Sequence, residues 1–357
     1  MTGRERLLCA LNHEIPDTVP IFESIYSRPF FKEVLGYDVD SYNAYDLMKC
    51  SEKVGYDFII VPFGGLNGFG KDRLTATTNR YQDEWGVTYQ KDPAAWPTDA
   101  PVEFPLEDRN DWNNYDFPDA SAPGRVDEVN TALRLAKENG MGVMCNVRGP
   151  YTGAWMLFGI ENFSYLFYDD PDLVHEILQK CTDFSITGAK RALEAGVDAI
   201  MFADDYGSCS APLLSPALHK EFIVPQLKRL ADVVHSYGKK LIMHSDGNIR
   251  TLLDPIFEAG IDGYHPIERA ANMDIAEIKR TYGDRITLAG NINNKTTLVT
   301  GTPEDVAEEV RETIRVAAPG GGFIVTSDHS IHDDTPNENV FAMIEATRKY
   351  GKYPLSF

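Results

Sequence analysis

The stretch DAIMFADDYGSCSAPLLSPALHKEFIVPQLKRLADVVHSYGKKLIMHSD, residues 198–246, contains two short apolar runs separated by a helical segment. The runs 198–205 and 240–246 both stop at polar residues. Between them, residues 215–238 place apolar side chains at helical spacing, with Ser215 followed by Pro at the start and Gly238 near the end. A strand, a crossover helix and a second strand predict parallel pairing with a right-handed connection.

The same pattern recurs along the chain. Eight segments read as strands: 18–24, 56–62, 140–147, 198–205, 240–246, 261–267, 286–292 and 322–328. Helices are predicted between the later strands, over 171–196, 215–238, 249–260 and 302–318. Eight units of this kind predict an α/β protein of the (β/α)8 TIM-barrel class, with an open doubly wound sheet as the alternative.

Residues 64–125 interrupt this alternation. The stretch 64–74 is rich in glycine, 79–92 reads as a hairpin, and 93–124 is dense in Pro, Asp and Trp. The glycines do not have the spacing of a phosphate-binding loop, which argues against nucleotide binding. We expect one domain, 1–357, in which 64–125 is an insertion or lid over one end of the barrel.

Composition excludes several classes of function. The formal net charge of −20 disfavours nucleic acid as a partner, and no apolar run has the roughly 20 residues of a membrane helix. Five scattered cysteines without a Cys-x-x-Cys pair suggest neither a disulfide framework nor a thiolate zinc knuckle. The first 20 residues lack the features of a signal peptide, so we expect a cytoplasmic protein with reduced thiols.

Polar residues stand at nearly every predicted strand end, where a barrel carries its chemistry. Each could simply begin a loop or cap a helix. That interpretation explains poorly why three of the eight histidines fall at such ends. The residues concerned are Glu23, Asn146, Arg148, Asp204, Asp205, His244, Asp246, His265, Glu268, Asn291, Asp328 and His329.

His244 and Asp246 are two residues apart and therefore point to the same side of an extended chain. With His329 they offer the nitrogen and oxygen ligands of a zinc-type site that keeps one position open. Alternatively, Asp246 orients His244 in an acid/base pair. In a third interpretation Asp246 only caps a loop, and the spacing alone leaves all three open.

Three segments, 202–268, 282–293 and 318–340, resemble the uroporphyrinogen decarboxylase superfamily, most of all the branch that contains cobamide-dependent methyltransferases and uncharacterised relatives. The resemblance is specific from about residue 140 onward, and residues 4–22 resemble the family's opening helix and strand. It implies the (β/α)8 barrel already predicted from the strand count.

Two departures from the family pattern bear on function. The decarboxylases carry Arg-Gln-Ala-Gly-Arg-Tyr after the first strand, whereas residues 22–34 read FESIYSRPFFKEV and offer only Arg28, so a tetrapyrrole would lack its cationic clamp. The methyltransferases typically hold zinc with His-x-Cys and a later Cys. Here the first position is His244, Asp246 replaces the first Cys, and the third position falls near His329. Such ligands would make the ion a harder Lewis acid, suited to an oxygen or nitrogen leaving group.

The resemblance therefore implies a metal-dependent methyltransferase that moves a methyl group from a small O- or N-methylated compound to a corrinoid. The Asp-x-His-x-x-Gly docking motif of corrinoid proteins is absent from the sequence, so a separate partner protein would carry that cofactor. Alternatives are a decarboxylase for a carboxylated substrate and a non-catalytic binding barrel. A homodimer is possible, because barrels of this family often dimerise.

The expected roles follow from this interpretation. His244, Asp246 and His329 would bind zinc or a similar divalent ion or, without a metal, act as acid and base. Glu23 would be a further ligand or would orient one, and Asp204 and Asp205 would bind substrate or orient a ligand. The expected pocket lining, for an aromatic substrate or the flat corrinoid, is Asn146, Trp155, Tyr206 and His265.

Overall fold

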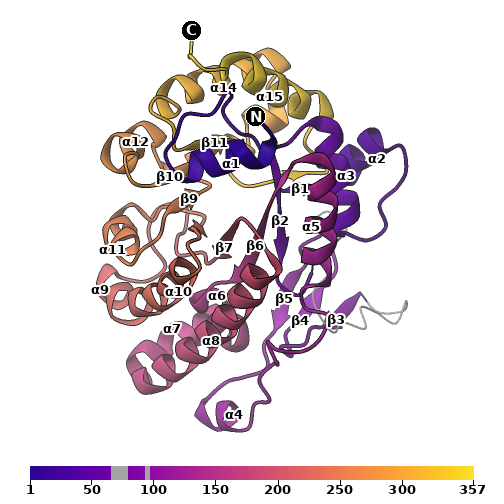
Figure 1. Ribbon diagram of the computed structural model, residues 1–357. Helices are drawn as coiled ribbons and strands as arrows, with labels where there is room; N and C mark the ends of the chain where they lie inside the picture. Colours follow the sequence, from indigo (N-terminus) through magenta and orange to yellow (C-terminus); the bar gives the residue numbers. More distant parts are fainter. Residues whose placement is uncertain (66–78, 93–96) are drawn as a thin grey trace.

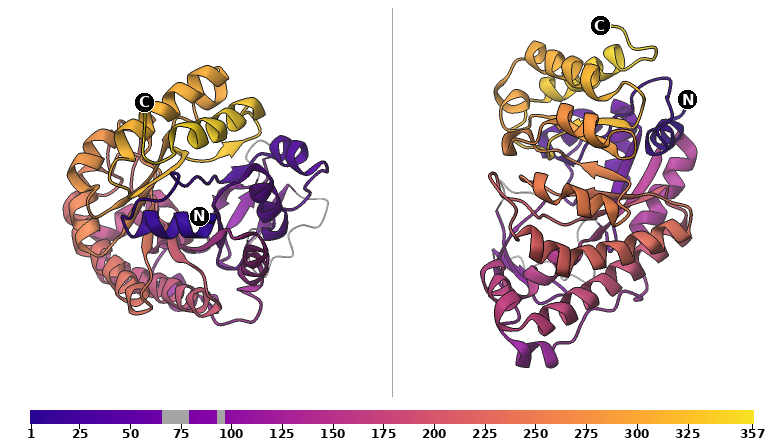
Figure 2. Two further views of the ribbon diagram at one scale, coloured as in Figure 1. Left: turned by 45° about the horizontal axis from the view of Figure 1, so that its top comes forward. Right: turned by 90° about the vertical axis from the view of Figure 1, so that its left-hand side faces the viewer.

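The computed structural model describes residues 1–65, 79–92 and 97–357. Its centre is a curled sheet of seven parallel strands in the order β11-β10-β9-β8-β7-β6-β2, with helices on its outer side (Figures 1 and 2). Each strand lies within one of the predicted segments or extends it by one residue. The strands are β2 (Phe58–Pro62), β6 (Gly142–Arg148), β7 (Ala199–Ala203), β8 (Leu241–His244), β9 (Gly263–His265), β10 (Thr287–Ile292) and β11 (Phe323–Ser327).

The eighth predicted segment, 18–24, closes the gap between β11 and β2. Ile21 bridges Val325 in parallel, and the Val325 amide donates to the Pro20 carbonyl at 2.9 Å. On the other side, the Asp57 amide donates to the Ile21 carbonyl at 2.9 Å. The segment is extended but does not form a regular ladder. It completes the barrel, which confirms the predicted fold class. Just beyond it, β1 (Ile25–Tyr26) pairs with β12 (Ile331–His332).

The predicted helices are present, with local differences. Within the predicted segment 171–196, Pro171–Ala195 form one long helix, α8, whereas 215–238 divide into α9, a π-helical turn at His219–Ile223, and α10. Among the described residues, no helix combines the length and apolar character needed to cross a bilayer. The helices are α1 (Gly3–Leu11), α2 (Arg28–Leu35), α3 (Ala44–Val54), α4 (Arg109–Asn113), α5 (Asp127–Asn139), α6 (Pro150–Phe158), α7 (Ile160–Asp169), α8 (Pro171–Ala195), α9 (Pro216–Leu218), α10 (Val224–Ser236), α11 (Leu253–Glu258), α12 (Ile275–Tyr282), α13 (Thr297–Thr300), α14 (Pro303–Ala317) and α15 (Asn337–Tyr350).

Alternation along the strands divides the core in two. One set of side chains packs against the outer helices, and the other set fills the barrel together with Leu7, Ala10 and Leu11 of α1. Helix α1 thus plugs the amino-terminal end of the barrel, leaving the carboxyl end for polar groups. The inward set comprises Phe22, Phe58, Met144, Ala199, Met201, Ile242, Ala289 and Ile324.

The insertion contains the predicted hairpin. Strands β3 (Arg80–Gln82) and β4 (Thr88–Gln90) pair antiparallel, and β5 (Ala100–Glu103) extends them to a three-stranded sheet. Trp85 in the hairpin turn is buried, with its ring 4.7 Å from that of Phe184 on α8. Most of the glycine-rich stretch 64–74 lies outside the described residues. That 64–125 acts as a lid on a single domain stays a prediction.

Candidate functional site

Four strands end in one row at the carboxyl end of the barrel. Arg148 on β6 pairs in register with Ala203 on β7, Ala203 with His244 on β8, and His244 with His265 on β9. Residues in register share a face of the sheet, and alternation from Met144, Met201 and Ile242 makes that face the inner one. The row therefore lines the barrel mouth.

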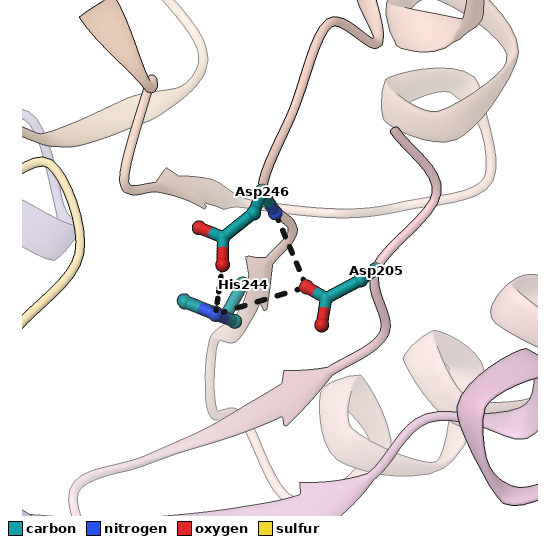
Figure 3. Close-up of side chains that lie close together, drawn as sticks. All are labelled: Asp205, His244 and Asp246. Atoms are coloured by element: carbon teal, nitrogen blue, oxygen red, sulfur yellow. Dashed lines mark hydrogen bonds and ion pairs between the residues drawn. The ribbon is translucent and has the colours of Figure 1, made fainter. Parts of the chain in front are cut away.

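Next to this row, Asp205 and Asp246 converge on His244 (Figure 3). His244 Nε2 lies 3.8 Å from Asp205 Oδ1 and 3.7 Å from Asp246 Oδ2, and the Asp246 amide donates to Asp205 Oδ1 at 3.2 Å. One ligand atom from each of the three residues lies within 4.8 Å of the others. His329 Nε2 is 3.2 Å from Asp246 Oδ2. The three expected metal ligands are thus gathered around Asp246, and Asp205 joins them.

His265 is hydrogen-bonded to His244. Their Nδ1 atoms are 2.7 Å apart, so one ring donates to the other. Burial, together with the neighbouring His244 and His329, holds the pKa of His265 well below its usual range, which keeps this ring neutral. If His244 donates from Nδ1, its Nε2 lone pair faces the two carboxylates. That is the tautomer a metal ligand requires.

Asp246 is held in its ionised form by its neighbours. Burial acts to raise the pKa of Asp246, but His244 and the hydrogen bond from His329 outweigh it and hold that pKa well below its usual range. Burial acts to lower the pKa of His329, yet its hydrogen bond to Asp246 raises it overall. Asp246 Oδ1 is buried and has no hydrogen-bond partner in the structure. An ionised carboxylate oxygen of this kind, beside an imidazole, is a donor set for a zinc-type ion.

Glu23 lies near the end of the segment 18–24, where its side chain meets β11. Its carboxylate accepts hydrogen bonds from the amides of Ser24 and Ser327, both at 2.8 Å. Burial raises the pKa of Glu23 to about 7, and these donors oppose the rise only in part. Glu23 lines a cavity of about 110 Å³ whose walls also include Phe22, Tyr26, Tyr42, Ile60, Asn146, Met201, His244 and His265. A group that exchanges a proton near neutral pH thus faces the same space as His244.

Asp204 occupies a different environment from its neighbour Asp205. It is fully buried and accepts hydrogen bonds from the Tyr151 and Thr152 amides, at 3.1 and 2.5 Å, and from the Tyr206 hydroxyl at 2.6 Å. Burial raises the pKa of Asp204 to about 7. The Asp204 carboxylate thus accepts from free amides in the first turn of α6 and stabilises the start of that helix. Asp204 and the expected lining residues Tyr206 and Trp155 are absent from the walls of the cavity next to Glu23.

A second cavity, of about 260 Å³, adjoins the first. The two share Pro62, Asn146 and Ala203. The walls of the larger cavity include residues for which the sequence analysis predicts no role: Phe63, Asp83, Glu84, Trp85, Arg125, Arg148 and Phe184. No sequence signal marks Trp85 or Phe184 as pocket residues, because they lie far apart in the chain and meet only in the folded structure. Arg148 was visible only as a polar strand end.

Comparisons with known proteins agree with this architecture. The chain is 28% identical over 229 residues to the methylcobamide:CoM methyltransferase MtaA of Methanosarcina barkeri, a match that covers 63% of this chain and 64% of that protein. It is 27% identical over 280 residues to a uroporphyrinogen decarboxylase of Coxiella burnetii, covering 75% and 74% of the two chains. The match therefore spans less than two thirds of the methyltransferase's length.

A solved structure, a methyltransferase from Methanosarcina mazei, superposes with a TM-score of 0.74 over 98% of this chain and 99% of that one, at 22% sequence identity. At that identity the likeness establishes the fold. The family model described as uroporphyrinogen decarboxylase (URO-D) matches residues 96–350. The relatives in this family are enzymes, both methyltransferases and decarboxylases. The chain belongs to the uroporphyrinogen decarboxylase family.

Proposed function

We propose that this protein is a metal-dependent methyltransferase that moves a methyl group from a small O- or N-methylated compound to a corrinoid held by a partner protein. The observation that carries the proposal is the cluster of His244, Asp246, Asp205 and His329, with an unpartnered buried oxygen on Asp246. A zinc-type ion bound there would act as a Lewis acid that polarises the oxygen or nitrogen leaving group.

The side chains have separable roles in this scheme. His244 presents Nε2, and His265 fixes its ring through the contact between their Nδ1 atoms. Asp246 supplies an ionised oxygen, while Asp205 or His329 completes a set of three ligands. Glu23, whose pKa is about 7, holds a proton on a large part of its carboxyl groups at neutral pH and would deliver it to the oxygen or nitrogen from which the methyl group has departed.

The identity of the ligands supports an oxygen or nitrogen leaving group. A site with two imidazoles and carboxylates is harder than one with two thiolates, and a harder ion polarises hard atoms better. None of the five cysteines is part of the cluster found among the described residues. A corrinoid partner is supported by the similarity to a methylcobamide methyltransferase and by the missing docking motif in this chain.

Metal analysis tests the first half of the proposal. Untagged protein should contain about one zinc-type ion per chain by plasma mass spectrometry, and His244→Ala and Asp246→Ala should lose it. Asp328→Asn is the matched control, because Asp328 lies at a strand end of the same mouth but accepts from the Asn294 and Arg269 amides. A folded wild type that binds no metal after incubation with zinc would contradict the site.

Turnover tests the second half. Metal-loaded protein and a reconstituted corrinoid protein should demethylate at least one member of a broad panel of methoxy compounds and methylamines, with methylcorrinoid followed by its absorbance. No demethylation across the panel would contradict methyl transfer. Loss of carbon dioxide from a carboxylated substrate would instead favour the second candidate, a decarboxylase. That candidate is supported by the 27% identical relative, although Arg28, the one arginine in the clamp region, is paired with Asp333 at 3.0 Å.

A further inference from the structure

Arg148 stands at the same level of the barrel mouth as His244. The register places Arg148, Ala203 and His244 side by side on β6, β7 and β8. Two inter-strand spacings of about 4.8 Å separate the arginine and histidine backbones by about 10 Å. Only the methyl side chain of Ala203 stands between them in this row, and Ala203 lines both cavities. A ligand can therefore reach from one residue to the other.

The Arg148 guanidinium has hydrogen-bonding capacity to spare. Its Nη1 atom is buried without a partner, and none of the ion pairs among the described residues includes Arg148. The guanidinium carbon lies 4.9 Å from the centre of the Trp85 ring, which fixes the group in the wall of the larger cavity. Arg148 as a whole is half-buried, and it also interacts with Tyr89, whose hydroxyl donates to Asp83. A buried, unpartnered guanidinium nitrogen such as Nη1 is costly unless an acceptor comes to meet it.

The other charged groups in this cavity are already engaged. Arg125 donates to both carboxylate oxygens of Glu84, at 2.9 and 2.5 Å. Asp83 accepts from the amides of Trp85 and Val87 and from the Tyr89 hydroxyl. Neither carboxylate in the cavity wall is therefore paired with Arg148, which remains available to a carboxylate from outside.

We propose that Arg148 holds the carboxylate of a small, flat, anionic substrate whose methylated end lies at His244 and Asp246. As a statement about the substrate, this rests on the proposed function. The flat body would lie against Phe63, Trp85 and Phe184, which wall the cavity. A cavity of roughly 150 Å³ already accommodates benzene, so about 260 Å³ leaves room for a ring that carries substituents.

Benzoate and benzamide test the anion site without any methyl transfer, because the two molecules share a shape and differ in charge. Isothermal titration should show benzoate binding about tenfold or more tightly than benzamide to the wild type. Arg148→Gln should abolish the preference, and Arg148→Lys should retain part of it. The matched control is Arg134→Gln, which removes the same charge from an exposed position on α5 and should leave the preference unchanged.

Three results would overturn the proposal. The wild type could bind both probes equally, or bind neither at millimolar concentration. The preference for benzoate could also survive in Arg148→Gln. The wild-type comparison stands even if Arg148→Gln fails to fold. A benzoate preference that depends on Arg148, in a protein that demethylates nothing, would refute the proposed methyl transfer while leaving the anion site intact. Demethylation of neutral compounds only would refute the anion site alone.

Discussion

The ends of β6 to β11 all carry polar side chains, but two groups of these side chains use their hydrogen-bonding capacity in opposite ways. In one group Glu268, Asn291 and Asp328, here called the bonded rim, have both oxygens or both amide atoms in hydrogen bonds. The other group is the open rim: Asn146, Arg148, His244, Asp246 and His265.

Four members of the open rim have a buried atom without a partner, namely Asn146 Oδ1, Arg148 Nη1, Asp246 Oδ1 and His265 Nε2. Close to the bonded rim, Asn294 Oδ1 is also unpartnered. Buried polar atoms are nearly always bonded in proteins, so unpartnered ones concentrated in one group mark where a ligand is received. The comparison teaches that a polar strand end indicates function only when its bonding capacity is left over.

Replacing one residue of each rim by alanine gives the largest expected contrast, since one variant should lose activity and the other stability. In His244→Ala, methyl transfer should fall on the order of a thousandfold, because the electrostatic stabilisation supplied at the site is lost. Asn291→Ala should instead lower the free energy of unfolding by roughly 1–3 kcal/mol, since Arg269 and the Ile267 carbonyl lose partners. Turnover and chemical denaturation of both variants check this. A metal-depleted but fully stable Asn291→Ala would break the comparison.

The adjacent residues Asp204 and Asp205 allow the same contrast within one loop. Asp204→Ala should cost roughly 3–5 kcal/mol of stability, because two amides and the Tyr206 hydroxyl lose a buried acceptor. Asp205→Ala should cost less than about 1 kcal/mol, since its side chain is 45% exposed. Urea denaturation measures both. Equal losses would mean that Asp205 also belongs to the scaffold.

The stability of the protein should depend on pH through Glu23. Its folded-state pKa of about 7 lies above the ordinary glutamate value of 4.5, so the native state binds the proton more tightly than the unfolded state does. The contribution is therefore fully present below pH 4.5 and lost as pH rises through 7. It amounts to roughly 3 kcal/mol.

Asp204 and Asp328 shift in the same direction, so the difference between wild type and Glu23→Gln isolates this group. Between pH 5 and 8, the melting temperature of Glu23→Gln should fall less steeply with rising pH than that of the wild type. Identical pH profiles for the two proteins would show that Glu23 is ionised throughout.

Trp155 should give the smallest effect. It is half-buried on α6 and lines neither cavity of the mouth. Trp155→Phe should change kcat and KM by no more than about twofold. A large rise in KM would show that Trp155 contacts the substrate, as the sequence analysis expects, and that the binding surface reaches α6.

Much of the fold could be predicted because short-range sequence patterns indicate most of its strands and helices. Period-two alternation and helical spacing mark seven strands and their helices, and the same alternation puts His244 and Asp246 on one side. The first strand, 18–24, was harder, because it is held by isolated bonds to Val325 and Asp57.

The site could be predicted only in part. Strand-end position predicts Glu23, His244, Asp246 and His329 as candidates, but nothing in the pair Asp204–Asp205 reveals which carboxylate is enclosed by α6. That depends on where the Tyr151 and Thr152 amides lie in space. Likewise the Trp85 ring meets Arg148 only because the insertion folds back over β6.

The position of α1 and the following segment has a consequence for how the protein is made. Residues 20–22, near the start of the chain, bond to Val325, and the Ala10 carbonyl accepts from the Thr287 hydroxyl, 277 residues away. During synthesis the opening segment must wait, with its apolar face uncovered, until almost the entire polypeptide has emerged. Contacts this distant in sequence slow folding. Barrel closure, and with it the binding geometry at the opposite end, is therefore among the last events in the maturation of the molecule.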